Sequence, residues 1–158
     1  MQIRRATIAD IDEIAQLYRD TIINVNAKDY TKEQIDAWAA TYNNQEGWVR
    51  RMEEQYFYVA VSDNKIVGFA SIDKFGYFDL LYVHKDCQKQ GIGSKLAAKI
   101  EEVANETELN EITVQASISA KPLFEKLGYK VTGEKHKTVS NVPFTNTVMA
   151  KRLKEVWK

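Results

Sequence analysis

The stretch from position 77 to position 107 constrains the fold most, because a strand-like segment leads through a glycine-containing loop into a helix-like segment. Residues 77–84 are mostly aromatic and apolar, which is typical of a β-strand. Residues 91–107 place their apolar side chains at the spacing of an amphipathic helix, at Ile92, Leu96, Ala97, Ile100, Val103 and Ala104. The sequence therefore predicts a strand and a helix joined by a short loop.

The joining loop reads Gln88-Lys89-Gln90-Gly91-Ile92-Gly93. Two glycines let the backbone turn several N–H groups towards a ligand, and the helix N-terminus adds a partial positive charge. We expect an anion to bind here, and a diphosphate would fit. The alternative is that the glycines serve only to turn the chain from strand to helix.

Two common nucleotide loops do not match this segment. A dinucleotide-binding fingerprint needs a third glycine where the chain has Leu96, and a P-loop needs Gly-Lys-Ser/Thr where it has Gly93-Ser94-Lys95. The diphosphate therefore belongs to another kind of ligand.

The remaining pattern predicts one domain, residues 1–158, with a mixed order of strands and helices. Chains of this length have room for one sizeable core. The order favours an α+β (mixed α/β) fold with about six or seven strands over a regular βαβ winding. We expect strands near Ile3 and at 56–61, 65–72, 77–84, 111–116, 129–139 and 144–153, and helices at 10–22, 31–38, 91–107 and 119–127, with a short helical turn at 48–52.

Composition excludes several functional classes. Twenty-two basic residues balance twenty-two acidic ones, so the chain lacks the positive field on which non-specific nucleic-acid binding depends. No segment is long and apolar enough to cross a membrane, and no apolar leader follows Met1, so we expect a cytoplasmic protein without a membrane partner. Cys87 is the only cysteine, and the two histidines, His84 and His136, are too few for a zinc site. We expect no metal.

Two motifs give the chain a family resemblance. The pattern Gln-x-x-Gly-x-Gly that follows Leu81-Tyr82-Val83 resembles the acyl-CoA diphosphate loop of the GNAT superfamily of N-acetyltransferases. The run Leu123-Phe124-Glu125-Lys126-Leu127-Gly128-Tyr129 is similar to the second signature of that family. The resemblance covers residues 3–153 and is nearest to an uncharacterised bacterial subgroup. It implies a mostly antiparallel sheet with two central strands splayed apart and about four flanking helices.

The resemblance also implies a donor site for acetyl-CoA. The pantetheine arm would pair with the strand at 81–83, in the splay towards the strand at 112–116, and the diphosphate would lie on the amides of 88–94. Ser119 stands where many relatives have an asparagine near the cofactor. The implied cofactor-binding residues are Leu81, Tyr82, Val83, Gln88, Lys89, Gln90, Gly91, Ile92, Gly93, Ser94 and Ser119.

The implied reaction is acetyl transfer to a primary amine of a small molecule, peptide or protein, by direct attack in a ternary complex. An alkyl amine has a pKa of about 10, so a general base is useful. We expect Asp79 to be the base, with a surface aspartate, a water chain or a histidine as alternatives. Phe124 occupies the position of the family's usual acid, a tyrosine, so we assign the acid to Tyr82, with Tyr129 or solvent as alternatives.

The acceptor side is less specified by the sequence. The segment before the first hairpin covers the acceptor in the family, so Tyr30 and Trp38 are expected to wall its pocket, with Trp48 as a further candidate and core packing as the alternative. The acceptor itself and the oligomeric state stay open, a homodimer included. A non-catalytic acyl-CoA-binding regulatory module is the alternative function, because Phe124 cannot act as an acid. A domain used only for protein interaction is a third.

Overall fold

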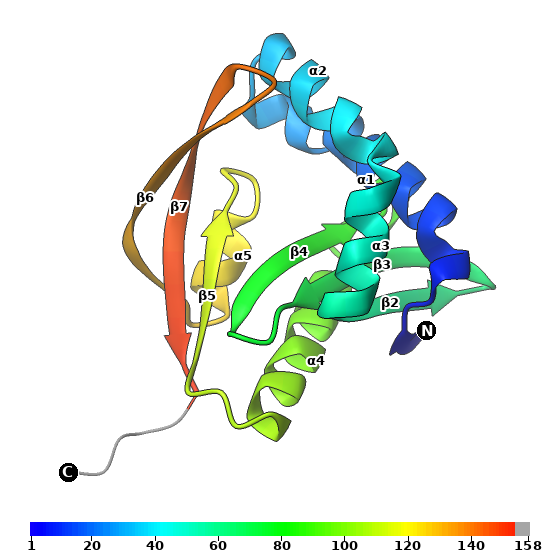
Figure 1. Ribbon diagram of the computed structural model, residues 1–158, viewed down its shortest axis with the longest axis vertical. Coiled ribbons are helices and arrows are strands. Elements are labelled where there is room, and N and C mark those ends of the chain that lie inside the picture. The colour runs from blue at the N-terminus through cyan, green and yellow to red at the C-terminus, as the bar shows by residue number, and fades with distance from the viewer. Residues whose placement is uncertain (154–158) are drawn as a thin grey trace.

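A seven-stranded mixed sheet forms the centre of the molecule in a computed structural model that describes residues 1–153 (Figure 1). Its order is β1-β2-β3-β4-β5-β7-β6. Every neighbouring pair is antiparallel except β4 and β5, which are parallel. The predicted α+β class and mostly antiparallel sheet are confirmed. The strands are β1 (Gln2–Arg5), β2 (Tyr56–Ser62), β3 (Lys65–Ile72), β4 (Tyr77–Val83), β5 (Glu111–Ala116), β6 (Lys130–Val139) and β7 (Val142–Arg152).

Five α-helices flank the sheet, one more than the expected number: α1 (Ile11–Asn24), α2 (Lys32–Ala39), α3 (Gln45–Glu54), α4 (Ile92–Glu106) and α5 (Lys121–Lys126). The extra helix, α3, was expected only as a short turn. It begins earlier because the Asn44 side chain caps it by accepting a hydrogen bond from the Gly47 amide, at 3.2 Å. None of the helices within residues 1–153 has the length and apolar character needed to cross a bilayer.

Two of the hairpin turns, between β2 and β3 and between β6 and β7, carry left-handed backbone at both central residues, as two-residue hairpins require. Asp63 and Asn64 have φ of 51° and 61°, which confirms the predicted turn between β2 and β3. Ser140 and Asn141 have φ of 48° and 67°. The last turn is therefore shorter than the expected loop at 140–143, and Pro143 lies within β7.

Strands β2 to β4 are covered on both faces. Side chains such as Phe57, Phe69 and Leu80 pack with α1, α2 and α3 on one face. Their strand neighbours, such as Ala70 and Phe78, pack with α4 and α5 on the other face. This two-sided burial explains why these strands are almost continuously apolar instead of alternating.

The sheet opens between β4 and β5. The two strands pair only at Tyr77 with Thr113 and at Phe78 with Val114, and beyond that point they diverge (Figure 1). A β-bulge marks the place: Ile72 lies opposite Phe78 and Ser71 opposite Leu80, so Asp79 is an extra residue in β4. A bulge bends its strand and increases the local twist. The bend keeps β4 on β3 while β5 follows β7, and the predicted splay is confirmed.

Candidate functional site

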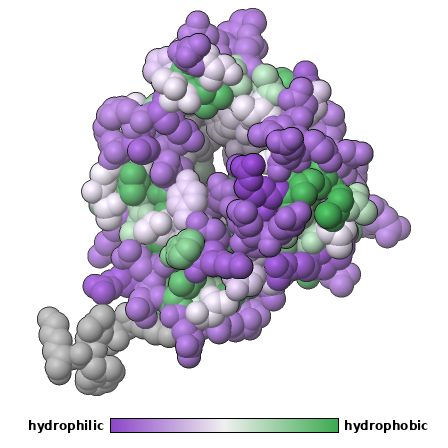
Figure 2. Space-filling view, viewed as in Figure 1, coloured by the Kyte–Doolittle hydropathy of each residue, from purple (hydrophilic) through white to green (hydrophobic). Residues whose placement is uncertain are grey.

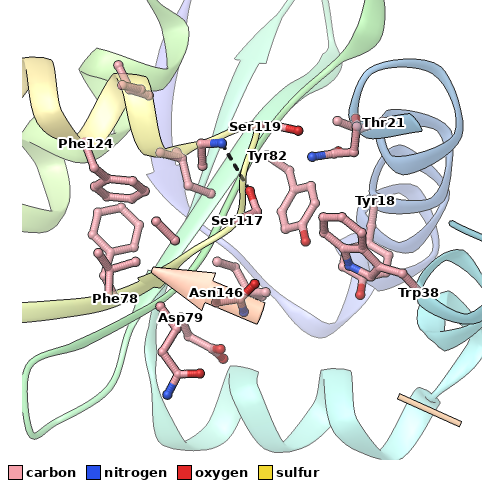
Figure 3. Close-up of a pocket in the computed structure, with 18 of the residues that line it drawn as sticks. Tyr18, Thr21, Trp38, Phe78, Asp79, Tyr82, Ser117, Ser119, Phe124 and Asn146 are labelled. Atoms are coloured by element: carbon pink, nitrogen blue, oxygen red, sulfur yellow. Dashed lines mark hydrogen bonds between the residues drawn. The ribbon is translucent and has the colours of Figure 1, made fainter. Parts of the chain in front are cut away.

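The splay opens into a cavity of about 350 Å³ at the centre of the molecule. Helices α1, α2 and α3 form one wall, β4, β5 and α5 form another, and the β6–β7 hairpin closes a third side. The molecule is visibly hollowed there (Figure 2). Polar and aromatic side chains from segments far apart in sequence point into this space (Figure 3).

The backbone of β4 supplies free polar groups to the cavity. The His84 amide donates to the Val67 carbonyl at 2.8 Å. Because alternate residues of a strand face the same neighbour, the amides of Tyr82 and Leu80 also face β3. The N–H and C=O groups of Leu81 and Val83 therefore face the gap, where the two amides and the Leu81 carbonyl are free to pair with a ligand. Within residues 1–153 no strand pairs with this edge of β4 beyond Phe78. An extended polar chain can pair with it as a strand would.

The loop after β4 is fixed to the end of that strand. The Gln88 side chain donates to the Val83 carbonyl at 2.7 Å, and the Thr21 hydroxyl donates to the same carbonyl at 3.2 Å. Lys89 and Gly91 both adopt left-handed backbone, with φ of 61° and 80°. These contacts hold the turn in one conformation at the entrance to α4.

The two glycines of the loop, Gly91 and Gly93, are required for different structural reasons. A Cβ on Gly91 would meet no atom within 4 Å, so this position needs glycine for its backbone conformation and keeps open space beside it. A Cβ on Gly93 would lie 3.1 Å from a methyl group of Leu123, so this position needs glycine for the close packing of α4 on α5. No side chain among the described residues caps the first turn of α4, and its free amides can bind an anion.

Asp79 points into the cavity with one oxygen occupied and one free (Figure 3). Its Oδ2 accepts hydrogen bonds from Arg51 Nε at 2.8 Å and from Gln55 Nε2 at 2.9 Å. The carboxylate keeps 18% of its side-chain exposure. Helix α3 thus fixes the orientation of Asp79, and the other oxygen, Oδ1, remains available to a ligand.

Tyr82 projects into the cavity between Phe124 and Trp38 (Figure 3). Its ring stacks on Phe69 with centroids 5.3 Å apart and lies 4.9 Å from the ring of Tyr18. Part of its surface faces the cavity, but burial of the ring raises the pKa of its hydroxyl well above the ordinary value. Tyr82 therefore carries its proton at neutral pH and can donate it.

Phe124 is buried at the position where the second signature of the family has a tyrosine. Its ring packs edge-on against Phe78 at 5.2 Å and Tyr129 at 5.0 Å. Phe124 lines the cavity, whereas Tyr129 lies behind it in the core. The Tyr129 hydroxyl is buried without a hydrogen-bond partner among the described residues. Of the two candidate acids, only Tyr82 reaches the cavity.

The mouth of the cavity is crossed by contacts between the α1–α2 segment and the β5–α5 loop. The Tyr30 hydroxyl accepts a hydrogen bond from the Ile118 amide at 2.8 Å, and the Ser119 hydroxyl donates to Asp29 at 2.7 Å. Burial raises the pKa of Tyr30. Trp38 lies beside Tyr30, with ring centroids 5.2 Å apart.

Most of the predicted site residues converge on the cavity. Its lining includes Tyr30, Trp38, Asp79, Leu81, Tyr82, Val83, Gln88 and Ser119. The other loop residues, at 89–94, lie outside it at the start of α4, and the Ile92 side chain is buried in the core. Trp48 is also a core residue, and its indole N–H donates to the Tyr42 carbonyl at 2.8 Å.

The candidates that we considered as alternatives lie away from the cavity. His84 accepts a hydrogen bond from the Asp86 amide at 3.1 Å, and His136 is exposed beside Thr145. Cys87 packs against the core under α4. No group of three His, Cys, Asp or Glu side chains within residues 1–153 could hold a metal ion.

Four polar residues stand out among the lining and supporting residues that sequence reasoning missed. Arg51 and Gln55 hold Asp79, and Lys137 and Asn146 reach the cavity from the β6–β7 hairpin. The only local signal for Arg51 was its place in the last turns of a helical segment. For Lys137 and Asn146, the alternation along a hairpin that begins at Ser140-Asn141 could have placed them on one face.

Comparison with known proteins places these features in a family. A family model described as an acetyltransferase (GNAT) domain matches residues 26–153. The uncharacterized N-acetyltransferase YafP of Escherichia coli is 28% identical over 149 residues, 94% of each chain. A GCN5-related N-acetyltransferase from Rhodopseudomonas palustris has a TM-score of 0.92 and 28% identity, covering 96% of this chain and 94% of that one. YncA from Salmonella typhimurium, solved with acetyl-CoA, shares the fold with a TM-score of 0.70 and 21% identity, covering 100% of this chain and 96% of that one.

Proposed function

The chain belongs to the GNAT family of acetyltransferases, and on that premise we propose that it transfers the acetyl group of acetyl-CoA to a primary amine of a small molecule, peptide or protein. The observation that carries the proposal is the gap between β4 and β5, which opens at Asp79 and leads to the uncapped first turn of α4. The acetyl-CoA complex of YncA supports the choice of donor. We further propose that residues 1–158 act as one domain. A cytoplasmic location and a homodimer stay predictions.

The donor is proposed to lie along the free edge of β4. The amides of Leu81 and Val83 and the carbonyl of Leu81 face the gap and suit the amide-bearing pantetheine arm. The Val83 carbonyl is already engaged by Gln88 and Thr21. The diphosphate is proposed to lie on the amides of 88–94, where Gly91 leaves open space. Ile92 contributes only its amide because its side chain is buried. The Ser119 hydroxyl donates a hydrogen bond to Asp29 and can at the same time accept one from acetyl-CoA.

Asp79 is proposed as the general base. Acetyl-CoA supplies the acyl group as a thioester, and the amine must lose a proton before it can attack. The free Oδ1 of Asp79 points into the cavity and can accept that proton directly or through one water. Arg51 and Gln55 orient the carboxylate through its other oxygen, Oδ2. The backbone amides at the splay can stabilise the developing oxyanion.

Tyr82 is proposed as the general acid. It faces the cavity, and its hydroxyl is protonated at neutral pH, as a tyrosine of ordinary pKa already is and as burial, which raises the pKa of Tyr82, reinforces. It can donate that proton to the departing thiolate of CoA. A thiol has a pKa of about 8.5, so the thiolate needs only modest help. Tyr30 and Trp38 are proposed to wall the acceptor.

The direct test is incubation of the protein with acetyl-CoA and a panel of amines, with release of free CoA thiol as the readout. Calorimetric titration with acetyl-CoA is run in parallel. Binding with thiol release supports the enzyme. Tight binding with no release for any amine would favour the non-catalytic acyl-CoA-binding module, for which the buried Phe124 is the supporting observation. Absence of binding would refute both and leave a domain for protein interaction.

A further inference from the structure

The inner face of the β6–β7 hairpin carries positive charge towards the acceptor side of the cavity. In the register of this hairpin, Lys137 lies opposite Phe144 and Lys135 opposite Asn146. Paired residues point to the same face of a sheet, and alternate residues along a strand share a face. Lys135 and Lys137 therefore both point to the face that Phe144 and Asn146 present to the cavity, and Lys137 itself lines it.

The opposite face of β6 has a different composition. There His136 lies 2.9 Å from Thr145 and 3.7 Å from the carboxylate of Glu134. Lysines on an edge strand discourage pairing with other chains, but either face would serve that purpose. Protection of the edge strand therefore does not explain why Lys135 and Lys137 share the inner face while Glu134 lies on the outer face.

The charges around the cavity do not balance. Within residues 1–153, Asp79 is the only carboxylate in its lining, and it is already paired with Arg51. Lys137 is the other cation in the lining, and its side-chain ammonium makes no ion pair or hydrogen bond within residues 1–153. An acceptor with several positive charges would be repelled by Lys137. An acceptor with a negative group would be attracted to it.

Asn146 adds an unpartnered polar group to the same wall. The residue is only 8% exposed, and its side chain points into the cavity (Figure 3). Its side chain has no hydrogen-bond partner within residues 1–153, yet its amide atoms are not among the fully buried ones without a partner, so they face the cavity. An amide that faces a cavity without a protein partner can hydrogen-bond to a polar group of a bound molecule.

The hairpin also limits the size of the acceptor. The Gln34 side chain donates to the Pro143 carbonyl at 3.1 Å and joins the hairpin to α2. The Phe144 ring lies 5.9 Å from Tyr30 and 6.1 Å from Trp38. These contacts close one side of the cavity with aromatic surface, which suits a small molecule with an apolar part better than a folded protein.

We propose that the acceptor is a small primary amine that also carries a carboxylate, as an amino acid does. Lys137 binds the carboxylate, Asn146 donates a hydrogen bond to the same molecule, and the aromatic wall contacts its apolar part. This inference rests on the proposed N-acetyltransferase function. It names the acceptor class that the function leaves open.

The test compares matched acceptors that differ only in the carboxylate: phenylalanine with phenylethylamine, and leucine with isoamylamine. For the wild type we expect kcat/KM to be higher for the amino acids by about tenfold or more, the scale of one charge-assisted hydrogen bond. Lys137→Met should abolish that preference, and Lys137→Arg should keep it. Lys65→Met, at the exposed start of β3, is the matched control and should change nothing.

The outcomes separate this inference from the proposed function. If the amines without a carboxylate react as well as the amino acids, or if Lys137→Met keeps the preference, the inference is refuted and the proposed function stands. If none of these four acceptors releases CoA thiol while another amine of the panel does, the inference is refuted and the proposed function stands. If no amine of the whole panel releases CoA thiol, the proposed function is refuted and the inference with it. A lower kcat/KM for phenylalanine in Lys137→Met, with kcat/KM for phenylethylamine unchanged, supports the inference.

Discussion

The substitution Gly91→Ala should weaken acetyl-CoA binding while it changes stability only slightly. Gly91 has φ of 80°, and an added Cβ meets no atom within 4 Å. The structural cost is therefore the left-handed conformation alone, about 1 to 2 kcal/mol. For a chain of this length each kcal/mol lowers Tm by about 2 to 4 °C. The new methyl group enters the open space where the diphosphate is proposed to lie.

Gly76→Ala is the matched control for the backbone term. Gly76 has φ of 99°, and its added Cβ would lie 2.6 Å from the carbonyl oxygen of Glu111. The substitution therefore lowers the free energy of unfolding by the same conformational cost and by a further steric strain of about 1 to 3 kcal/mol. Gly76 lies at the closed end of the splay, where its carbonyl accepts from the Thr113 amide at 2.9 Å. We expect a larger fall in Tm for Gly76→Ala than for Gly91→Ala.

Calorimetric titration with acetyl-CoA, below the Tm of each variant, distinguishes the two positions. Gly91→Ala should raise Kd by about tenfold or more, since one or more hydrogen bonds from amides to a charged phosphate are lost. Gly76→Ala should bind acetyl-CoA within about threefold of the wild type once folded, because it lies away from the loop. Unchanged affinity in Gly91→Ala would refute the placement of the diphosphate.

Three further predictions concern the chemistry and the pH dependence. Asp79→Asn should lower kcat by about 100-fold or more with little change in acetyl-CoA affinity, and a loss below about threefold would remove Asp79 from the base role. Trp38→Ala should raise KM for the acceptor and leave acetyl-CoA affinity unchanged, and an unchanged KM would take Trp38 out of the acceptor wall. Burial, then the nearby charge of Asp79, raises the pKa of Tyr77 to about 12, and burial raises that of Tyr82 as well. These folded-state pKa values exceed the unfolded value of about 10, so above pH 10 the unfolded chain loses these protons before the folded protein does. The stability that the two tyrosines contribute is therefore complete below pH 10 and is lost as the pH rises towards 12. The midpoint of guanidinium unfolding should fall over this interval, and less so in Tyr77→Phe; a flat profile would contradict the burial of these tyrosines.

Local periodicity was enough to predict most of the fold. The apolar stripe of α4 and the turn at Asp63-Asn64 each depend on neighbouring residues, and both are confirmed. Helix α3 was underestimated because a glycine, Gly47, lies in its first turn and only Trp48 in it is buried. The bulge at Asp79 arises from the pairing of β4 with β3. No pattern within β4 alone could show it.

The candidate site was predicted less completely, because its parts come from distant segments. The loop at 88–93 is local, and its glycines gave a clear signal. Arg51 and Gln55 lie 28 and 24 residues before Asp79, so the sequence does not show that they hold its carboxylate. Lys137 stands in the charged run Lys135-His136-Lys137, which is typical of a solvent-exposed strand. Only the register of the hairpin places Lys137 at the cavity.

A crystal structure with acetyl-CoA tests the central claim most directly, namely that the gap between β4 and β5 is the donor site. The predicted result is a pantetheine arm hydrogen-bonded to the backbone of Leu81 and Val83, with the diphosphate on the amides from Gln88 to Ser94. The thioester should then lie within reach of Asp79 and Tyr82. Acetyl-CoA bound at another surface, with the gap between the two strands empty, would contradict the claim.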